Sequence, residues 1–143
     1  KKYNVPIIAD GGIKNSGDFS KALAAGALTA MVGSLFAGTD EAPGEYIMED
    51  GQAFKLYRGM ASREAGEDKV KLDGAGDGFG RAPEGKTGRV PYRGSARNVV
   101  SDLLAGLRSS MSYLGAKNLK EFHKNAEFIK ITQATQKENQ ARN

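Results

Sequence analysis

The chain has 143 residues, a net charge of +4, no cysteine and one histidine. The missing cysteines exclude disulfides, thiolate metal sites and a cysteine nucleophile within the chain, and one histidine argues against a histidine metal site or a Ser-His-Asp triad. Lysines and arginines are scattered rather than interleaved with aromatic residues, so we expect no nucleic-acid partner. No apolar run is long enough to cross a membrane.

A strand–helix–strand unit is predicted at the start of the chain. Residues 5–9 and 29–32 are short apolar runs, typical of strands buried on both faces. Between them, Asn15 or Ser16 can cap a helix and Gly26 can end it. The two strands are therefore expected to be parallel neighbours.

The rest of the chain divides into four stretches. Residues 44–59 form a predicted hairpin, because Asp50-Gly51 is a strong two-residue turn signal between apolar runs. Residues 60–88 are polar and glycine-rich, which predicts a mobile flap. Residues 95–132 predict a long helix capped by Ser95, a short helix capped by Asn118 and a terminal strand at 127–132, and residues 133–143 form a polar tail.

Two glycine-containing corners are the first candidate site residues. Asp10, Gly11 and Gly12 follow the first predicted strand, and Gly33 and Ser34 follow the second. Ligands of α/β folds gather at the carboxyl ends of strands, where a carboxylate can accept hydrogen bonds from ribose hydroxyls. The amides and the serine hydroxyl can hold a phosphate. Tight turns alone explain either corner equally well, and only their occurrence on successive strands favours the functional interpretation.

Further candidates lie in the hairpin and the flap. Tyr57 can reach a phosphate with its hydroxyl, or simply pack on the hairpin. Glu84 can act as an acid or base on a mobile segment, with Arg81 and Lys86 meeting phosphates. A solvated charge cluster is the more frequent explanation of such a segment.

Several motifs, in this order, resemble the IMP dehydrogenase/GMP reductase family along most of the chain, up to about Thr132. They are Ala-Asp-Gly-Gly-Ile at 9–13, Met-Val-Gly-Ser-Leu-Phe-Ala-Gly-Thr at 31–39, Pro-Gly-Glu at 43–45, Tyr-Arg-Gly-Met-Ala-Ser at 57–62, Gly-Leu-Arg-Ser at 106–109 and Tyr-Leu-Gly-Ala at 113–116. The resemblance implies the C-terminal part of a (β/α)8 TIM barrel with a protruding hairpin and a flap. It also implies a cytoplasmic homo-tetramer without a metal site.

The resemblance further implies a role for each candidate residue. The position of Asp10 binds the ribose of GMP or IMP. Independently of the resemblance, Gly11 and Gly12 have no side chains and let a ligand approach the backbone closely. The positions that hold the phosphate are Gly12, Gly33, Ser34 and Tyr57. Gly59 and Met60 lie along the base, and Glu84 faces the purine ring. Arg81 and Lys86 contact the dinucleotide cofactor.

Features of both branches of the family occur in the sequence. The flap motif Arg-Ala-Pro-Glu-Gly-Lys-Thr at 81–87 resembles the reductase, which reduces GMP to IMP and ammonia with NADPH, and no Arg-Tyr pair typical of the dehydrogenase lies between Arg63 and Glu84. The motifs at 42–45, 57–60 and 88–90 instead favour the dehydrogenase, which oxidises IMP to XMP with NAD. We expect the reductase. The alternatives are the dehydrogenase or a non-catalytic nucleotide-binding module.

The family's nucleophilic cysteine and its loop precede the Ala-Asp-Gly-Gly corner and are absent from this chain. We therefore expect a segment that is inactive alone and whose main partner is the remainder of the barrel subunit.

Overall fold

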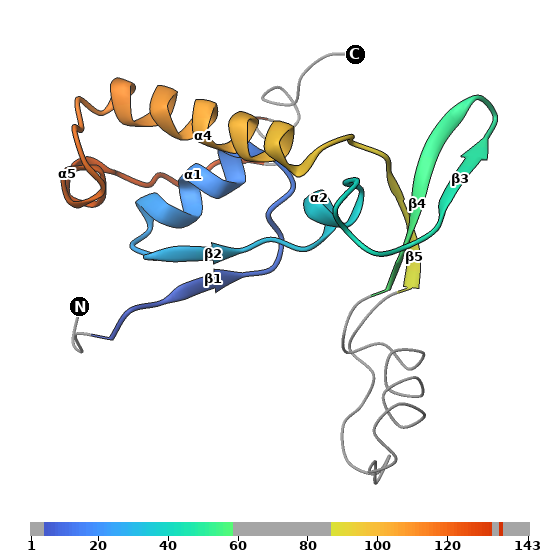
Figure 1. The fold of residues 1–143 in the computed structure, drawn as a ribbon. Coiled ribbons are helices and arrows are strands. Elements are labelled where there is room, and N and C mark those ends of the chain that lie inside the picture. Colours follow the sequence, from blue (N-terminus) through green and yellow to red (C-terminus); the bar gives the residue numbers. More distant parts are fainter. Residues whose placement is uncertain (1–4, 59–86, 133–134, 136–143) are drawn as a thin grey trace, which may run out of the picture.

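The computed structural model describes residues 5–58, 87–132 and 135, which form a helical part and a separate three-stranded sheet (Figure 1). Strands β1 and β2 pair in parallel, and strands β3, β4 and β5 form an antiparallel sheet in that order. The elements in chain order are β1 (Ile8–Asp10), α1 (Ser16–Ala24), β2 (Thr29–Met31), α2 (Ser34–Ala37), β3 (Tyr46–Glu49), β4 (Gln52–Arg58), β5 (Thr87–Pro91), α4 (Ala96–Tyr113) and α5 (Leu119–Asn125).

The first three elements form the expected strand–helix–strand unit. The side chain of Asn15 caps α1 by accepting a hydrogen bond of 2.9 Å from the backbone N–H of Asp18. Ile8 then pairs with Thr29, and Asp10 with Met31, in a parallel register. Because the strands are parallel neighbours, the loops that follow them leave the same edge.

Helices α4 and α5 cover α1 and complete the core. Ser95 and Asn118 cap these helices, each accepting a hydrogen bond from a backbone N–H of the first turn. Leu23 of α1, Leu107 of α4 and Phe122 of α5 form one buried apolar cluster. On α4, Val99, Leu103 and Leu107 are the buried residues, and this packing holds α1 in place beside the parallel strands.

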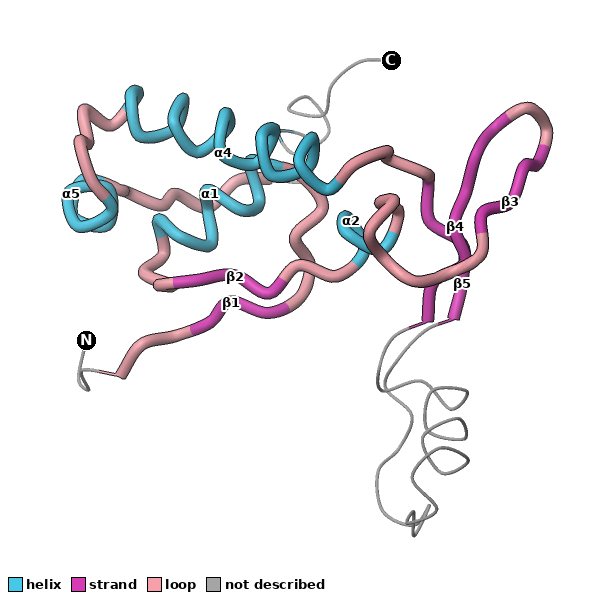
Figure 2. The backbone as a smooth tube through the Cα atoms, in the orientation of Figure 1, coloured by secondary structure: helices cyan, strands magenta, loops and turns pink. Residues whose placement is uncertain are grey.

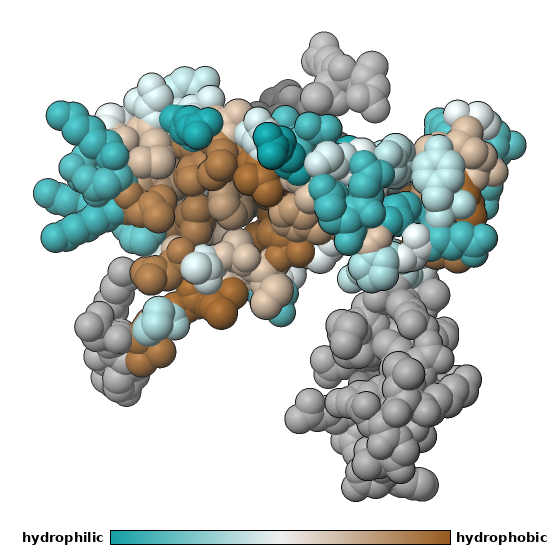
Figure 3. All heavy atoms as spheres, viewed as in Figure 1, coloured by the Kyte–Doolittle hydropathy of each residue, from teal (hydrophilic) through white to brown (hydrophobic). Residues whose placement is uncertain are grey.

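The two parallel strands are less buried than their apolar sequence predicts. The exposed fraction is 59% for Ile8 and 55% for Met31. Figure 3 shows apolar side chains gathered over β1 and β2. The physical reason is that this sheet has two strands, with helices packed on one side (Figure 2), so its other face has no cover within the described residues.

The antiparallel sheet contains the hairpin. Asp50 and Gly51 connect β3 to β4 with φ angles of 49° and 76°, as a two-residue hairpin turn requires. Strand β5 pairs with the other edge of β4, with Tyr57 opposite Gly88. Strand β5 begins at Thr87, so the last two residues of the stretch expected to be flap, 87 and 88, belong to this sheet.

One expected element does not form. Residues 127–132, predicted as a terminal strand, have no regular secondary structure. The side chains of Phe128 and Ile129 are 60% and 84% exposed. A strand needs a neighbour for its backbone hydrogen bonds, and none of the described strands pairs with this segment.

Candidate functional site

The two glycine-containing corners lie at one edge of the parallel sheet. Asp10 is the last residue of β1 and is paired with Met31, the last residue of β2. Gly33 and Ser34 follow two and three residues after Met31, where α2 begins. The parallel register therefore brings Asp10 close to the second corner, as the sequence predicts.

The backbone at the first corner depends on glycine. Gly11 and Gly12 have φ angles of 88° and 76°, in the left-handed region that side chains disfavour. Both glycines and Asp10 are exposed in this chain. The corner thus presents a carboxylate and an open stretch of backbone to a ligand.

Strand β4 brings a third segment to this site. A Cβ atom added to Gly33 would lie 3.3 Å from the hydroxyl oxygen of Tyr57. Gly33 has an ordinary φ of −100°, so the close approach of Tyr57, rather than backbone strain, explains a glycine here. The structure therefore brings Tyr57 close to Gly33 and its neighbour Ser34. In the sequence, Tyr57 lies more than twenty residues after these two.

These groups can bind a phosphorylated sugar. The hydroxyls of Ser34 and Tyr57 can donate hydrogen bonds to an anionic oxygen, and bonds to charged groups are the stronger ones. The carboxylate of Asp10 can accept hydrogen bonds from two neighbouring hydroxyls. We refer to Asp10–Gly12, Gly33, Ser34 and Tyr57 as the strand-end site.

Five predicted site residues lie outside the described part of the chain. They are Gly59, Met60, Arg81, Glu84 and Lys86. The ends that flank them are described: β4 ends at Arg58 and β5 begins at Thr87, side by side in one sheet. The described residues on either side of this segment therefore lie next to Tyr57.

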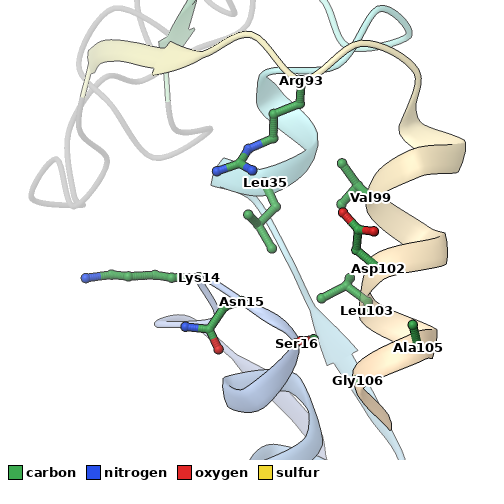
Figure 4. A pocket seen from close by; sticks show the side chains of 10 residues that line it. All are labelled: Lys14, Asn15, Ser16, Leu35, Arg93, Val99, Asp102, Leu103, Ala105 and Gly106. Atoms are coloured by element: carbon green, nitrogen blue, oxygen red, sulfur yellow. The ribbon is translucent and has the colours of Figure 1, made fainter. Parts of the chain in front are cut away.

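A cavity of about 470 Å³ lies beside the strand-end site, between the start of α1, α2 and α4 (Figure 4). Its polar lining includes Lys14, Arg93 and Asp102, and Leu35 and Leu103 supply apolar surface. This cavity is lined by residues other than those of the strand-end site. The strand-end site is the stronger candidate for a ligand, because ligands of α/β folds collect at strand ends and because three segments converge there.

Two carboxylates tie the segment after α2 to the segment after β5. The Tyr92 hydroxyl donates to the Asp40 carboxylate at 2.6 Å, and this bond raises the pKa of Tyr92. The backbone N–H of Ala96 and the hydroxyl of Ser95 donate to Glu41 at 2.7 and 2.9 Å. The hydrogen bond from the Ala96 backbone N–H contributes most to holding the pKa of Glu41 below its usual range. These contacts join the segment that follows the strand-end site to the start of α4.

Sequence reasoning missed Lys55, the one buried charged residue in the described part of the chain. Its side chain is 6% exposed, and its ammonium donates to the backbone carbonyl oxygens of Thr39 and Ala42. One signal was available in the sequence. Side chains of a strand point alternately to the two faces of a sheet, so Lys55 and Tyr57 of β4 share a face. The acceptors of Lys55 lie 16 and 13 residues away, and no local pattern indicates them.

The described residues, 5–58, 87–132 and 135, also bear on a metal site and on a membrane span. Across these ranges, no group of three or more His, Cys, Asp or Glu side chains is arranged to hold a metal ion. Each helix in the same ranges is too short or too polar to cross a membrane.

Comparison with known proteins gives a consistent result. The family described as "IMP dehydrogenase / GMP reductase domain" matches residues 1–142. Inosine-5'-monophosphate dehydrogenase of Chlorobaculum parvum is 52% identical over 139 residues, covering 93% of this chain and 28% of that protein. The enzyme of the same name from Aquifex aeolicus is 51% identical over 142 residues, covering 96% and 29%.

A solved structure agrees with these sequence matches. The crystal structure of a GMP reductase variant from Trypanosoma brucei, in complex with guanosine 5'-monophosphate, superimposes with a TM-score of 0.86 at 43% identity. The match covers 97% of this chain and 28% of that one. The chain thus spans less than a third of the length of these relatives. The α/β content and this neighbour fit part of a TIM-barrel enzyme, and the chain belongs to the IMP dehydrogenase/GMP reductase family.

Proposed function

We propose that this chain is the C-terminal part of a (β/α)8 barrel oxidoreductase that reduces GMP to IMP and ammonia with NADPH. The observation that carries the nucleotide assignment is the convergence of Asp10, Gly33 and Tyr57 at one edge of the parallel sheet. The structural neighbour, a GMP reductase, was crystallised with guanosine 5'-monophosphate, which supports a purine monophosphate as the ligand.

Each residue of the strand-end site has a proposed role. Asp10 accepts hydrogen bonds from the ribose hydroxyls, and Gly11 leaves room for the sugar. The phosphate is held by Gly12, Gly33, Ser34 and Tyr57. Gly59 and Met60 then lie along the base. The apolar surface of β1 and β2 packs against the remainder of the barrel subunit, and the complete enzyme is a homo-tetramer.

The proposed reduction of GMP requires a cofactor and side chains that are not part of the strand-end site. The nicotinamide cofactor supplies a hydride when bound, and Arg81 and Lys86 are proposed to contact it. Glu84 is proposed to move a proton at the purine, so that the departing amine leaves as ammonia. Since the chain holds no cysteine, the nucleophile of this family must come from the remainder of the subunit.

Dehydrogenation of IMP to XMP with NAD is the second candidate. The curated relatives at 52% and 51% identity are both named inosine-5'-monophosphate dehydrogenase, whereas the reductase structure is 43% identical. The reductase proposal depends on the motif at 81–87 and on the missing Arg-Tyr pair. The two reactions share the nucleotide site and differ in cofactor and in leaving group.

Assays of both reactions on the complete enzyme separate these proposals. We expect GMP-dependent oxidation of NADPH, with ammonia released in equal amount. IMP-dependent reduction of NAD at a higher kcat/KM would overturn the reductase assignment in favour of the dehydrogenase. Nucleotide binding without either reaction would identify a non-catalytic module.

Replacing Glu84 tests its proposed catalytic role. Glu84→Gln should lower turnover about 10²–10⁴-fold, the usual contribution of a positioned acid or base, and leave GMP affinity almost unchanged. Lys86→Ala should mainly raise the KM of the dinucleotide. Full turnover in Glu84→Gln would remove Glu84 from the chemistry.

A further inference from the structure

We propose that Lys55 is a positioning residue for the phosphate end of the strand-end site. It acts by holding the segment after α2 against strand β4. This inference rests on the proposed function, because it assigns a task to a residue beside the proposed phosphate site.

The contacts of Lys55 connect two segments that are distant in sequence. Its ammonium donates to the carbonyl oxygen of Thr39 at 2.8 Å and to that of Ala42. Thr39 is itself 1% exposed, and its hydroxyl donates at 2.7 Å to the carbonyl oxygen of Phe36 in α2. A continuous set of hydrogen bonds therefore runs from β4 to the end of α2.

The burial of Lys55 argues for a specific task. Removing an ammonium group from water is costly unless its donors are satisfied. In the described part of the chain, no carboxylate forms an ion pair with it, and its acceptors are neutral carbonyl groups. An apolar side chain would avoid burying a charge, but it would remove the donor from the carbonyl oxygens of Thr39 and Ala42. A lysine instead fixes the direction of two carbonyl groups, which an apolar residue does not.

Lys55 is linked to the proposed phosphate site through Tyr57. Lys55 and Tyr57 are two residues apart on β4 and point to the same face of the sheet. The Tyr57 hydroxyl lies beside Gly33, the residue that precedes α2. Lys55 holds Thr39, two residues beyond the end of α2, by its carbonyl oxygen. Tyr57 thus lies beside the residue before α2, and Lys55 contacts residues after it. Loss of either interaction lets α2 shift relative to β4.

The test compares nucleotides with nucleosides on the complete enzyme. Lys55→Met keeps the length of the side chain and removes its donors. Affinity for GMP and IMP should fall about tenfold, the effect expected for losing one well-placed hydrogen bond to a charged group. Guanosine and inosine, which lack the phosphate, should bind as they do to the wild type. The KM of the nucleotide should rise while kcat stays within about twofold.

Two further variants and one substitute variant complete the experiment. Lys120→Met, on the exposed surface of α5, is the matched control and should bind both ligand classes like the wild type. Lys55→Arg keeps a charged donor and should recover part of the lost affinity. If Lys55→Met fails to fold, Lys55→Gln, which keeps one donor group, is measured in the same way.

The outcomes distinguish this inference from the proposed function. Tyr57→Phe and Ser34→Ala are titrated in parallel. If both leave GMP and IMP affinity unchanged, the phosphate site itself is wrong. If Tyr57→Phe and Ser34→Ala weaken nucleotide binding but the Lys55 variants do not, the positioning role of Lys55 is wrong. The same holds if the Lys55 variants weaken nucleoside binding as much as nucleotide binding. In both cases the proposed phosphate site is retained.

Discussion

The helical part of the chain and the three-stranded sheet are held by different forces. Helices α1, α4 and α5 meet through apolar side chains such as Leu23, Leu107 and Phe122. The sheet relies more on directed contacts, including the ion pair of Arg89 with Glu49 and the donors of Lys55. Apolar burial supplies most of the stability of a domain, whereas directed bonds fix positions. Mutations in the buried apolar cluster should therefore mainly affect unfolding, whereas mutations at the strand-end site, which contains residues of both parts, should mainly affect binding.

Phe122→Ala should give the largest effect on stability. Phe122 is 1% exposed, and truncation of a buried phenylalanine typically costs about 3–5 kcal/mol through lost burial and the cavity that remains. The midpoint of urea unfolding of the complete enzyme measures this change. Tyr113→Ala is the control, because Tyr113 is 88% exposed and should change stability by about 0.5 kcal/mol or less. Equal effects of the two variants would contradict the described core.

Asp10→Ala should weaken nucleotide binding without a comparable loss of stability. The expected loss is roughly 2–4 kcal/mol, because the ribose hydroxyls would lose their acceptor in the nucleotide complex. Calorimetric titration with GMP and with IMP measures it. Asp10→Asn keeps one acceptor oxygen and should bind with intermediate affinity. Unchanged affinity in both variants would remove Asp10 from the site.

Gly33→Ala should weaken nucleotide binding less than Asp10→Ala does. The new methyl group would lie 3.3 Å from the Tyr57 hydroxyl and force it to move by a few tenths of an ångström. We expect about a tenfold loss of GMP affinity, or about 1.4 kcal/mol. Gly88→Ala is the matched control, since a Cβ atom there meets nothing within 4 Å. Equal effects of the two substitutions would show that the approach of Tyr57 is unimportant.

The smallest effect concerns Glu41, which follows α2 in the chain and whose carboxylate contacts the start of α4. Hydrogen bonds from the backbone of Ala96 and from Ser95 lower the pKa of Glu41 below its ordinary value of 4.5. The carboxylate therefore stabilises the fold above that value, and this contribution is lost as the pH falls through the lowered pKa. Thermal unfolding from pH 7 to pH 3 should show a deficit for Glu41→Gln at pH 7 that vanishes in acid. A deficit independent of pH would contradict this assignment, and Glu127→Gln is the control.

Local signals predicted the three longer helices, but not the short helix α2. Ser95 and Asn118 were expected as caps, and Asn15 or Ser16 as the cap of α1. Ser95, Asn118 and Asn15 each accept the hydrogen bond that defines a cap. The hairpin turn at Asp50-Gly51 also forms where its sequence indicates. Such features depend on neighbouring residues, so they can be read from a short window.

Features that depend on distant partners were not predicted. The pairing of β5 with β4 and the acceptors of Lys55 join segments far apart in sequence. The apolar pattern at 127–132 predicted a strand, but a strand also needs a neighbour, and the described residues supply none. Within the strand-end site, the two corners could be predicted from strand order, whereas the approach of Tyr57 to Gly33 required the structure.

A crystal structure of the complete enzyme with GMP tests the central claim most directly. The account predicts ribose hydroxyls within hydrogen-bond distance of the Asp10 carboxylate, about 2.5–3.0 Å. Phosphate oxygens should contact the hydroxyls of Ser34 and Tyr57 at similar distances. A nucleotide bound instead in the cavity of Lys14 and Arg93, or away from the ends of β1 and β2, would contradict it.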